Sequence, residues 1–376
     1  MKIAIDVQSL YSTTPSGVGH YVLETILAMQ PDEHTELIFF SRGFSPLVLP
    51  ETLRRIPHVR HIHRRFPNKL INGLIALRLV SLEHLLGESV DAVWFPNTGY
   101  LPRTTAPTVL TVHDLAWYLI PETYNWMHHV RYRITRARTA LHRVTKLIAV
   151  SDSTQRDLTL HFGRSSKNSL TILHGLDHDL FQERPRPDDA TRRQQLGITQ
   201  PYLLSLATCE PRKNLPSLVD AFDQLRAQGH HIHLVLAGGR GWKRKALNRA
   251  IARSPYKQEI HLLGFVSDAD RPALLRGARA LVLPSRYEGF GMQIVEAMAC
   301  GTPVVTSRNS SLLEIGSDAV LSARAMNTNE LTQTIDQLLN DSNLQKELHQ
   351  RGIKRAQTFQ WSTCAQQTLD TLIKSV

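Results

Sequence analysis

Short runs of β-branched and aromatic residues alternate with longer stretches of helical periodicity along almost the whole chain. Such alternation is typical of a parallel, doubly wound sheet, because each crossover helix brings the chain back to the same end of the sheet. The sequence therefore predicts an α/β fold. The expected strands are residues 3–7, 37–40, 92–95, 109–112, 147–150 and 170–173 in the first half, and residues 202–206, 233–237, 259–264, 280–283, 303–306 and 319–322 in the second.

One charged segment separates these two sets of strands. Residues 181–195, FQERPRPDDATRRQQ, contain Pro185 and Pro187 and few apolar side chains that could be buried. A chain of 376 residues is also long enough for two domains of ordinary size. We therefore expect two Rossmann-like domains, the first ending at residue 180 and the second beginning at residue 181.

The composition is that of an ordinary globular protein. With 42% hydrophobic and 20% charged residues, a disordered or collagen-like chain is excluded. The three cysteines are widely spaced and form no CxxC pair, so neither a disulfide framework nor a cysteine-based zinc site is indicated. The opening residues, MKIAIDVQSL, have the pattern of a strand and not that of a signal peptide. We expect no membrane-spanning segment and a cytoplasmic location.

The positive charge is concentrated in one part of the chain. The formal net charge is +11, and residues 42–146 alone carry 15 Lys and Arg against 6 Asp and Glu. Within this part, residues 130–144 predict one core-packed helix with a basic outer face. A solvated face is the preferred interpretation, and a surface for anionic lipid or nucleic acid is the alternative. The apolar positions are Val130, Ile134, Ala137, Leu141 and Val144, and the basic ones are Arg131, Arg136, Arg138, Arg143 and Lys146.

The strongest local signal for chemistry is LPSRYEGFGMQIVEAMACGTPVV, residues 283–305. A strand ends here, a glycine-containing turn follows, and a helix is predicted from Met292 to Cys300. The first turn of such a helix presents backbone N–H groups and a partial positive charge, which suit a phosphate group. Glu288 precedes the turn and Glu296 follows it, so both carboxylates are expected near a bound phosphate ester.

This segment resembles the signature of the retaining nucleotide-sugar glycosyltransferases of family 4, whose two Rossmann-like domains face a central cleft in the GT-B fold. Further matches follow in the same order along nearly the whole chain, which makes the resemblance specific. They are GVGHY (17–21), VHD (112–114), AVSDSTQRDL (149–158), ILHGLDHDLF (172–181), EPRKN (210–214), LAGGRGW (236–242), GFVSD (264–268) and FQWSTCAQQTL (359–369). The resemblance implies an acceptor-binding domain over residues 1–180, a nucleotide-sugar-binding domain over residues 181–357, and a last helix within residues 358–376 that returns to the first domain.

The same resemblance implies catalytic roles for four residues and an acceptor contact for a fifth. Glu288 and His113 are expected to contact the transferred sugar, and Asp114 the acceptor hydroxyl. Arg212 and Lys213 are expected to clamp the diphosphate, because negative charge grows on the leaving nucleoside diphosphate. One departure stands out: many relatives have a further arginine just before the EPRK segment, where this chain reads LLSLATCE.

Other residues are expected to bind the nucleotide. Glu296 is the implied partner of the ribose hydroxyls, and the backbone at Val266 is the implied partner of the base. The remaining expected contacts are Gly17 and Gly19 near the amino terminus, and Phe290, Gly291 and Met292 at the start of the predicted helix.

Neither a metal ion nor a cofactor besides the donor is expected. The pairs Asp177/Asp179 and Asp268/Asp270 have DxD spacing, but the first pair lies between the domains and the second in a turn before a helix. The 18 histidines show no HExxH or cysteine-flanked spacing.

We therefore expect a retaining, metal-independent hexosyltransferase, with GDP-mannose the favoured donor. Its acceptor is expected to be a glycan or a polyprenyl-diphosphate-linked saccharide in bacterial surface-polysaccharide synthesis. Relatives that combine EPRKN with a GRGW-like segment are often mannosyl- or rhamnosyltransferases that use GDP sugars, and the preference for mannose rests on them. A nucleotide-sugar epimerase of the same architecture is one alternative. A basic nucleic-acid-binding protein is another, although no recognition motif accompanies the charge, so we expect no nucleic-acid partner.

Residues 64–86, RRFPNKLINGLIALRLVSLEHLL, combine a basic start with a strongly apolar, helix-like stretch. In related enzymes this part of the first domain often faces a lipid-linked acceptor. Attachment to an anionic membrane at the inner face of the plasma membrane is therefore one hypothesis, and an ordinary buried helix is the other.

Overall fold

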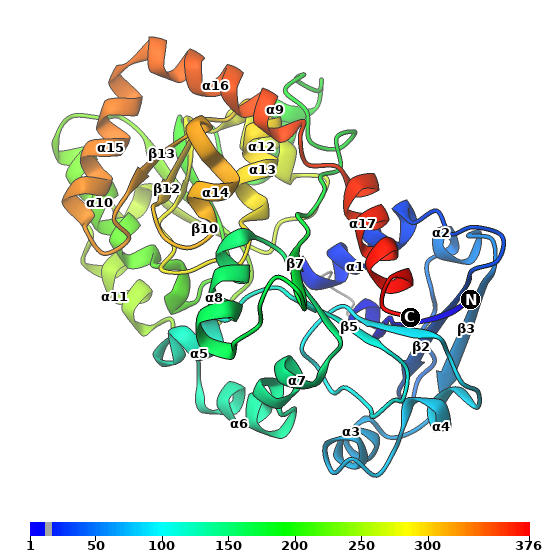
Figure 1. The fold of residues 1–376 in the computed structure, drawn as a ribbon. Helices are drawn as coiled ribbons and strands as arrows, with labels where there is room; N and C mark the ends of the chain where they lie inside the picture. The colour runs from blue at the N-terminus through cyan, green and yellow to red at the C-terminus, as the bar shows by residue number, and fades with distance from the viewer. Residues whose placement is uncertain (12–16) are drawn as a thin grey trace. The chain divides into compact units, whose positions relative to one another are not determined.

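The computed structural model describes residues 1–11 and 17–376, and these form two compact units (Figure 1). The first unit contains residues 1–115, 126–175 and 360–376, and the second contains residues 116–125 and 176–359. The main boundary thus lies a few residues before the division expected at residue 180. Nothing in the sequence pattern indicated that the short segment 116–125 joins the second unit.

The first unit is built on a seven-stranded parallel sheet with the order β3-β2-β1-β4-β5-β6-β7. Its strands are β1 (Lys2–Asp6), β2 (Glu36–Arg42), β3 (Val59–Arg64), β4 (Ala92–Phe95), β5 (Thr108–Val112), β6 (Lys146–Ala149) and β7 (Ser169–Thr171). Its helices are η1 (Gln8–Tyr11), α1 (Gly17–Ala28), α2 (Glu51–Arg54), α3 (Asn68–Ala76), α4 (Leu82–Leu86), α6 (Trp126–Ile134), α7 (Ala137–Arg143), α8 (Asp152–Phe162) and α17 (Trp361–Ile373). The last of these, α17, packs against α1.

The second unit is built on a six-stranded parallel sheet with the order β10-β9-β8-β11-β12-β13. Its strands are β8 (Tyr202–Leu206), β9 (His233–Ala237), β10 (Ile260–Gly264), β11 (Ala280–Leu283), β12 (Val304–Ser307) and β13 (Val320–Ala323). Its α-helices are α5 (Ala116–Leu119), α9 (Asp189–Gln195), α10 (Leu215–Ala227), α11 (Lys245–Arg253), α12 (Arg271–Gly277), α13 (Met292–Ala299), α14 (Leu312–Gly316), α15 (Thr328–Asn340) and α16 (Ser342–Ala356). Short 3-10 turns are η2 (Pro121–Thr123), η3 (Pro211–Lys213), η4 (Lys257–Glu259) and η5 (Ser317–Ala319).

The expected α/β fold with two parallel sheets is confirmed. Burial explains why most of the strands could be predicted from the sequence. Every residue of β4, β8 and β11 is buried, so these central strands are continuous apolar runs. The predicted strands missed only β3 of the first sheet. This edge strand reads VRHIHR, and its residues are partly buried or exposed, so no apolar run marks it.

The prediction of one core-packed helix over residues 130–144 is wrong. Arg136 adopts a left-handed conformation with φ of 51°, which ends α6 and begins α7 in a new direction. Helix α7 buries Ala137 and Leu141, whereas α6 buries none of its residues. Val130 is 42% exposed and Ile134 is 46% exposed, so the apolar face of α6 lies open to solvent.

The apolar segment 64–86 is also divided. It forms α3 and α4, which are separated by a turn in which Arg78 has φ of 64°. Ile71, Ile75 and Leu85 form a small core cluster, while Leu77 and Leu79 in the turn are exposed. Among the described residues, no helix has the length and apolar character needed to cross a membrane.

Candidate active site

Three loops meet at the carboxyl edge of the second sheet. They follow β8, β11 and β12, which are neighbours in the sheet, so their ends lie side by side. The strand order reverses between β8 and β11, and ligands bind at such switch points in open α/β sheets. The loops carry residues 207–214, 284–291 and 308–311.

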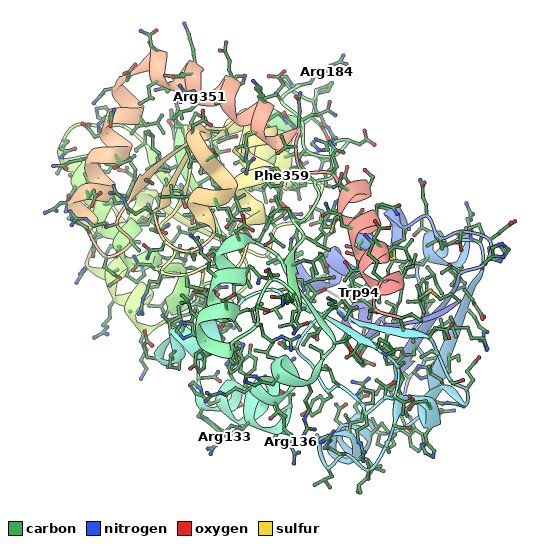
Figure 2. All side chains as sticks on the ribbon, in the orientation of Figure 1. Trp94, Arg133, Arg136, Arg184, Arg351 and Phe359 are labelled. Atoms are coloured by element: carbon green, nitrogen blue, oxygen red, sulfur yellow. The ribbon has the colours of Figure 1, made fainter. Side chains whose placement is uncertain are left out.

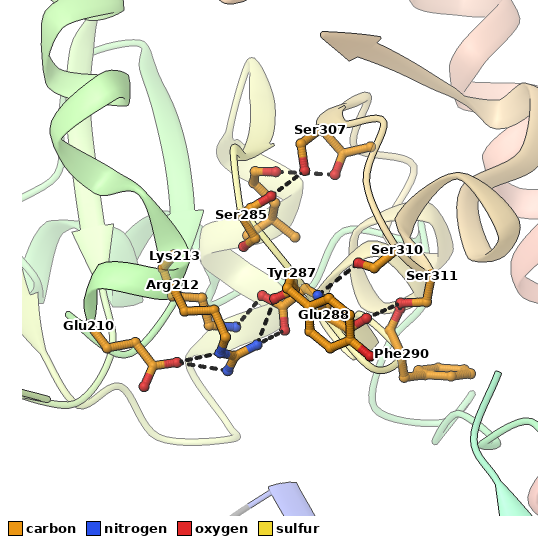
Figure 3. Close-up of polar contacts among 12 residues, drawn as sticks. Glu210, Arg212, Lys213, Ser285, Tyr287, Glu288, Phe290, Ser307, Ser310 and Ser311 are labelled. Carbon is orange, nitrogen blue, oxygen red and sulfur yellow. Dashed lines mark hydrogen bonds and ion pairs between the residues drawn. The ribbon is translucent and has the colours of Figure 1, made fainter. Parts of the chain in front are cut away.

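Two cations and two carboxylates form an ionic cluster in these loops (Figure 3). Glu288 accepts a hydrogen bond from Arg212 Nη1 at 2.6 Å and another from Lys213 Nζ at 2.6 Å. Glu210 accepts hydrogen bonds from Arg212 Nε at 3.0 Å and Nη2 at 2.7 Å. Glu210, Lys213 and Glu288 are buried, so this cluster is charged but largely shielded from water. The structure thus brings together three of the four expected catalytic residues and adds Glu210.

The two carboxylates of the ionic cluster differ in acidity. Burial alone would raise the pKa of Glu288, but the charges of Arg212 and Lys213 outweigh it and lower that pKa to about 2. Burial raises the pKa of Glu210, and the nearby cations offset this only in part. Glu288 is therefore ionised throughout the physiological pH range.

Serine hydroxyls from the loop after β12 fix the backbone around Glu288. Ser310 Oγ accepts a hydrogen bond from the Glu288 N–H at 2.8 Å. Ser311 Oγ lies 2.9 Å from the Glu288 carbonyl and 2.8 Å from the Phe290 carbonyl, and donates to this pair of acceptors. Sequence reasoning missed both serines, although their place directly after a buried strand, at the edge that binds ligands, was a usable signal.

Gly291 occupies a position that only glycine suits. Its φ is 105°, and a Cβ atom there would lie 2.9 Å from Leu312 Cδ2. The residue precedes α13, whose bounds agree with the predicted helix to within one residue. Met292 begins this helix and is partly buried. The Phe290 side chain packs edge-on against Phe359 with ring centroids 5.8 Å apart, so it faces its own unit's core.

Glu296 lies on α13 and is almost wholly buried. Its Oε1 accepts a hydrogen bond from Arg271 Nη1 at 2.9 Å, and Arg271 also pairs with Asp268 at 2.9 Å. The other carboxylate oxygen, Oε2, is buried without a hydrogen-bond partner within the described part of the chain. Burial raises the pKa of Glu296, Arg271 lowers it and Asp268 raises it. An acceptor oxygen of this kind suits a hydroxyl donor from a ligand. Arg271 was missed because it is distant in sequence from Glu296.

The backbone of the loop after β9 lies close to the backbone of the loop after β8. A Cβ atom on Gly238 would lie 2.1 Å from the Ala207 carbonyl oxygen, and one on Gly241 would lie 2.2 Å from that of Cys209. These glycines are therefore required by the close approach. After β10, the buried residue Val266 lies in the loop expected to meet the base.

The segment 116–125 is held by this part of the second unit. Trp242 Nε1 donates a hydrogen bond to the Thr123 carbonyl at 2.8 Å. Lys243 Nζ donates to the Glu122 carbonyl at 2.8 Å, and Arg286 forms an ion pair with the Glu122 carboxylate at 2.5 Å. These contacts explain why the segment joins the second unit although it lies within the sequence of the first.

His113 directly follows β5 at the carboxyl edge of the first sheet. Its Nε2 lies 2.8 Å from the Pro96 carbonyl oxygen. A carbonyl only accepts hydrogen bonds, so Nε2 carries the hydrogen and Nδ1 is an acceptor in the neutral ring. The Tyr21 ring packs edge-on against it with centroids 4.8 Å apart. Burial lowers the pKa of His113, which favours the neutral ring. Asp114 follows and is partly buried.

The GVGHY segment, residues 17–21, resembles a glycine loop but forms part of a helix in the structure. Gly17 and Gly19 lie in the first turn of α1, and Gly19 is buried. Residues 12–16, which precede them, lie outside the described residues. The resemblance to a glycine loop implies a turn in which the backbone at Gly17 and Gly19 approaches a ligand, whereas the structure places both residues in a helix.

The aspartate pairs with DxD spacing have protein partners. Asp177 Oδ1 accepts from the backbone N–H groups of Asp179 and Leu180, and Asp270 binds Ser267 and Arg192. Across the described residues, no group of three His, Cys, Asp or Glu side chains is arranged to hold a metal ion.

Two protein-family models match the chain, one in each half. The model described as Glycosyltransferase Family 4 matches residues 15–180. The model described as Glycosyl transferases group 1 matches residues 188–355. Together they include every expected site residue and every strand of the two parallel sheets except β1.

Individual proteins are similar over much of their length. The O-antigen chain mannosyltransferase B of Escherichia coli is 28% identical over 374 residues, which cover 96% of this chain and 98% of that protein. An uncharacterised glycosyltransferase of Methanocaldococcus jannaschii is 33% identical over 264 residues, which cover 70% of this chain and 67% of that protein. Among solved structures, sucrose-phosphate synthase of Thermosynechococcus elongatus has a TM-score of 0.77 at 20% identity, and the match covers 99% of this chain and 98% of that one. At that identity the structural match shows the fold alone.

Proposed function

Because the chain belongs to the glycosyltransferases of family 4 and has their GT-B fold, we propose that it is a retaining mannosyltransferase that uses GDP-mannose. In this proposal the acceptor is a hydroxyl of a glycan or of a polyprenyl-diphosphate-linked saccharide. The product belongs to O-antigen or a similar bacterial surface polysaccharide. Support for mannose and for the O-antigen comes from the nearly full-length match to the Escherichia coli mannosyltransferase.

The ionic cluster is the observation that carries this proposal. As the sugar departs, negative charge grows on the nucleoside diphosphate, and fixed cations nearby lower the barrier. Arg212 and Lys213 are such cations, and Glu210 and Glu288 already hold them in position. We assign the diphosphate to these two cations and the transferred sugar to the Glu288 carboxylate. Stabilisation of this kind needs no metal ion.

The remaining roles follow from hydrogen-bonding capacity. The partnerless Oε2 of Glu296 is assigned to a ribose hydroxyl, because a hydroxyl would satisfy a buried acceptor. The α13 amino terminus, with Gly291 and Met292, is assigned to a phosphate. In the first unit, the neutral His113 is assigned to a sugar hydroxyl and Asp114 to the acceptor hydroxyl. All three cysteines are buried thiols, which suits the cytoplasm proposed as the site of the reaction.

Nucleotide selectivity is the first test of this proposal. We expect GDP to raise the melting temperature more than UDP or ADP, since a ligand at a hundred times its Kd adds about 2.7 kcal/mol to the stability of the state it binds. The variant Glu296→Ala should lose this stabilisation. Stabilisation by UDP alone would overturn GDP-mannose as the donor. A salt-sensitive shift with a DNA oligonucleotide, and none with any nucleotide, would overturn the enzyme proposal.

Product analysis separates transfer from epimerisation. The protein is incubated with GDP-mannose in the presence and absence of a mannose-terminated oligosaccharide, with EDTA in both samples. The proposal expects an extended oligosaccharide with an α-linked mannose and free GDP, only when the acceptor is present. Conversion of the nucleotide sugar to its epimer without an acceptor would establish the alternative activity. Dependence on an added divalent ion would overturn metal independence.

A further inference from the structure

A cavity of about 260 Å³ lies in the first unit, at the junction of α6 and α7. Its walls come from the end of α3, residues 100–104, the start of β5 and the start of α7. Four arginines line it: Arg78, Arg103, Arg136 and Arg143. We call this site the arginine pocket. Of the described residues, those that line it include no acidic side chain, which sets it apart from the ionic cluster.

Within residues 1–11 and 17–376, none of the four guanidinium groups makes an ion pair or a side-chain hydrogen bond, so no carboxylate there neutralises them. Glu83 contacts the lining residue Thr104, and its Oε1 accepts hydrogen bonds from Thr104 Oγ1 at 2.7 Å and from the Thr105 N–H at 2.9 Å. Four like charges around one cavity repel one another, and an anion of two or more charges would relieve that repulsion.

Exposed apolar side chains flank the arginine pocket. Leu77 and Leu79 stand on either side of Arg78 and are 66% and 69% exposed. The uncovered face of α6 adds Trp126, Met127, Val130 and Ile134, and Ile134 itself lines the cavity. Figure 2 shows Arg133 and Arg136 at the outer edge of the first unit, beside α6 and α7. Trp94, by contrast, lies in the interior of this unit. Guanidinium groups beside exposed hydrocarbon match a ligand with an anionic head and an apolar chain.

The arginine pocket is separate from the proposed catalytic edge. Thr108, at the amino end of β5, lines the pocket, whereas His113 follows the carboxyl end of the same strand. Five residues of extended chain at about 3.3 Å each separate them by roughly 17 Å. A ligand head held in the pocket would therefore leave His113 clear.

From these observations we propose that the arginine pocket binds the phosphate or diphosphate head of an amphiphile whose hydrocarbon chain lies on the exposed apolar side chains of α6 and of the turn after α3. Two sources share this chemistry: the diphosphate of a lipid-linked saccharide and the phosphate of a membrane phospholipid. Only the identification of the first source with the acceptor rests on the proposed function. The binding itself does not.

Farnesyl diphosphate is the direct probe. Calorimetry with the full chain compares it with inorganic pyrophosphate, which lacks the hydrocarbon, and with farnesol, which lacks the charge. We expect farnesyl diphosphate to bind most tightly and farnesol least. The double variant Arg103→Gln/Arg136→Gln should weaken farnesyl diphosphate binding by about tenfold or more, because it removes two of the four cations that could donate charge-assisted hydrogen bonds to the diphosphate. Equal binding of farnesol, or unchanged affinity in this variant, would overturn the proposal.

A matched control removes two other exposed cations of the first unit. Arg156 on α8 and Lys374 after α17 are replaced together by Gln, which lowers the net charge equally. This control should keep the wild-type affinity, and an equal loss would mean that net charge and not the pocket binds the probe, which also overturns the proposal. Thr139→Phe, which fills the cavity without a change of charge, should weaken binding as the double variant does.

Vesicles distinguish the two sources. Sedimentation is measured with phosphatidylglycerol vesicles and with phosphatidylcholine vesicles, for the wild type and the double variant. Cosedimentation with phosphatidylglycerol that the double variant loses identifies the phospholipid headgroup. Binding of farnesyl diphosphate without cosedimentation identifies the lipid-linked diphosphate. The GDP-induced melting shift is recorded in parallel, because its absence in the wild type would count against the proposed function and not against the arginine pocket.

Discussion

The ionic cluster of the second unit and the arginine pocket of the first differ in whether their cations have carboxylate partners. In the ionic cluster of the second unit, Arg212 and Lys213 are paired with Glu210 and Glu288 at 2.6–3.0 Å. In the arginine pocket of the first unit, no carboxylate from the described part of the chain lines the cavity. A paired cation is fixed in position before a substrate arrives, whereas cations that lack carboxylate partners favour the arrival of an anion. We infer that the first arrangement serves chemistry and the second serves binding.

The largest expected effect comes from the charge of Glu288. The variant Glu288→Gln keeps the shape of the side chain but removes the charge that we assign to the transferred sugar. We expect kcat to fall on the order of a thousandfold, the scale of loss when one preorganised electrostatic group leaves an active site. GDP should bind at least as tightly as in the wild type, because Arg212 and Lys213 lose a competing anion. Steady-state kinetics and calorimetry measure the two effects.

A pH series on the same variant tests the pairing itself. The pKa of Glu288 is about 2 in the folded protein, below the ordinary value of 4.5. Ionised Glu288 therefore adds stability above pH 4.5, and this contribution is lost as the pH falls toward 2. The wild type should lose more stability than Glu288→Gln over that range. A separate control applies to the kcat loss of Glu288→Gln: the variant Glu347→Gln, on the exposed surface of α16, should leave kcat unchanged. Equal pH dependence of wild type and Glu288→Gln would contradict the pairing.

Removal of Arg212 should damage stability as well as activity. Arg212→Met leaves Glu210 and Glu288 buried with one cation fewer, and breaking a buried pair from one side costs about 3–5 kcal/mol. Chemical denaturation measures this loss. The double variant Arg212→Met/Glu288→Gln should recover part of it, since one of the stranded charges is gone. Additive losses in the double variant would show that the two residues do not interact.

Glu296 offers the reverse case, a buried carboxylate whose ionised form is disfavoured. Its pKa is raised by burial, so above its folded pKa the ionised group lowers the stability of the protein. Glu296→Gln should therefore melt at least as high as the wild type at pH 7. Because Gln lacks the charge of the proposed ribose partner, GDP should bind about 10- to 100-fold more weakly. A lower melting temperature together with unchanged GDP affinity would refute both assignments.

His113 tests whether the first unit contributes to chemistry as well as to binding. His113→Asn should lower kcat about tenfold, the worth of one hydrogen bond in the transition state, without changing GDP affinity. Because the pKa of His113 is lowered by burial, its ring is less charged at pH 6.5 than an ordinary histidine, which is half charged there. The ratio of wild-type to variant kcat should thus fall by less than half between pH 8 and pH 6.5. A fall to half or below would contradict the lowered pKa.

Much of the second unit could be predicted from the sequence because its signals are local. The bounds of β8, β9 and β11 agree with the predicted strands, and α13 begins at the predicted residue. Each depends on a short apolar run or on glycine at a helix end, features that act over a few residues. The spacing of Glu288 and Glu296 is likewise local.

The contacts that complete the ionic cluster are long-range and could not be predicted in this way. Glu288 meets Lys213 across 75 residues of sequence, and Ser310 reaches the Glu288 backbone from a different loop. The break at Arg136 was missed for a related reason. A non-glycine residue with positive φ leaves no mark in the periodicity, so the apolar repeat of residues 130–144 continues across it.

The smallest expected effect is the sharpest test of the comparison between the ionic cluster and the arginine pocket. Arg136→Gln removes one of four mutually repelling charges, so at low salt the variant should be slightly more stable than the wild type, by about 1 °C in Tm. The gain should vanish in 0.5 M NaCl, a concentration at which the Debye length is only about 4 Å. Arg212→Met changes stability in the opposite direction, because its cation has carboxylate partners. If Arg136→Gln were destabilised at both salt concentrations, Arg136 would have a structural partner, and the distinction between paired and unpaired cations would fail.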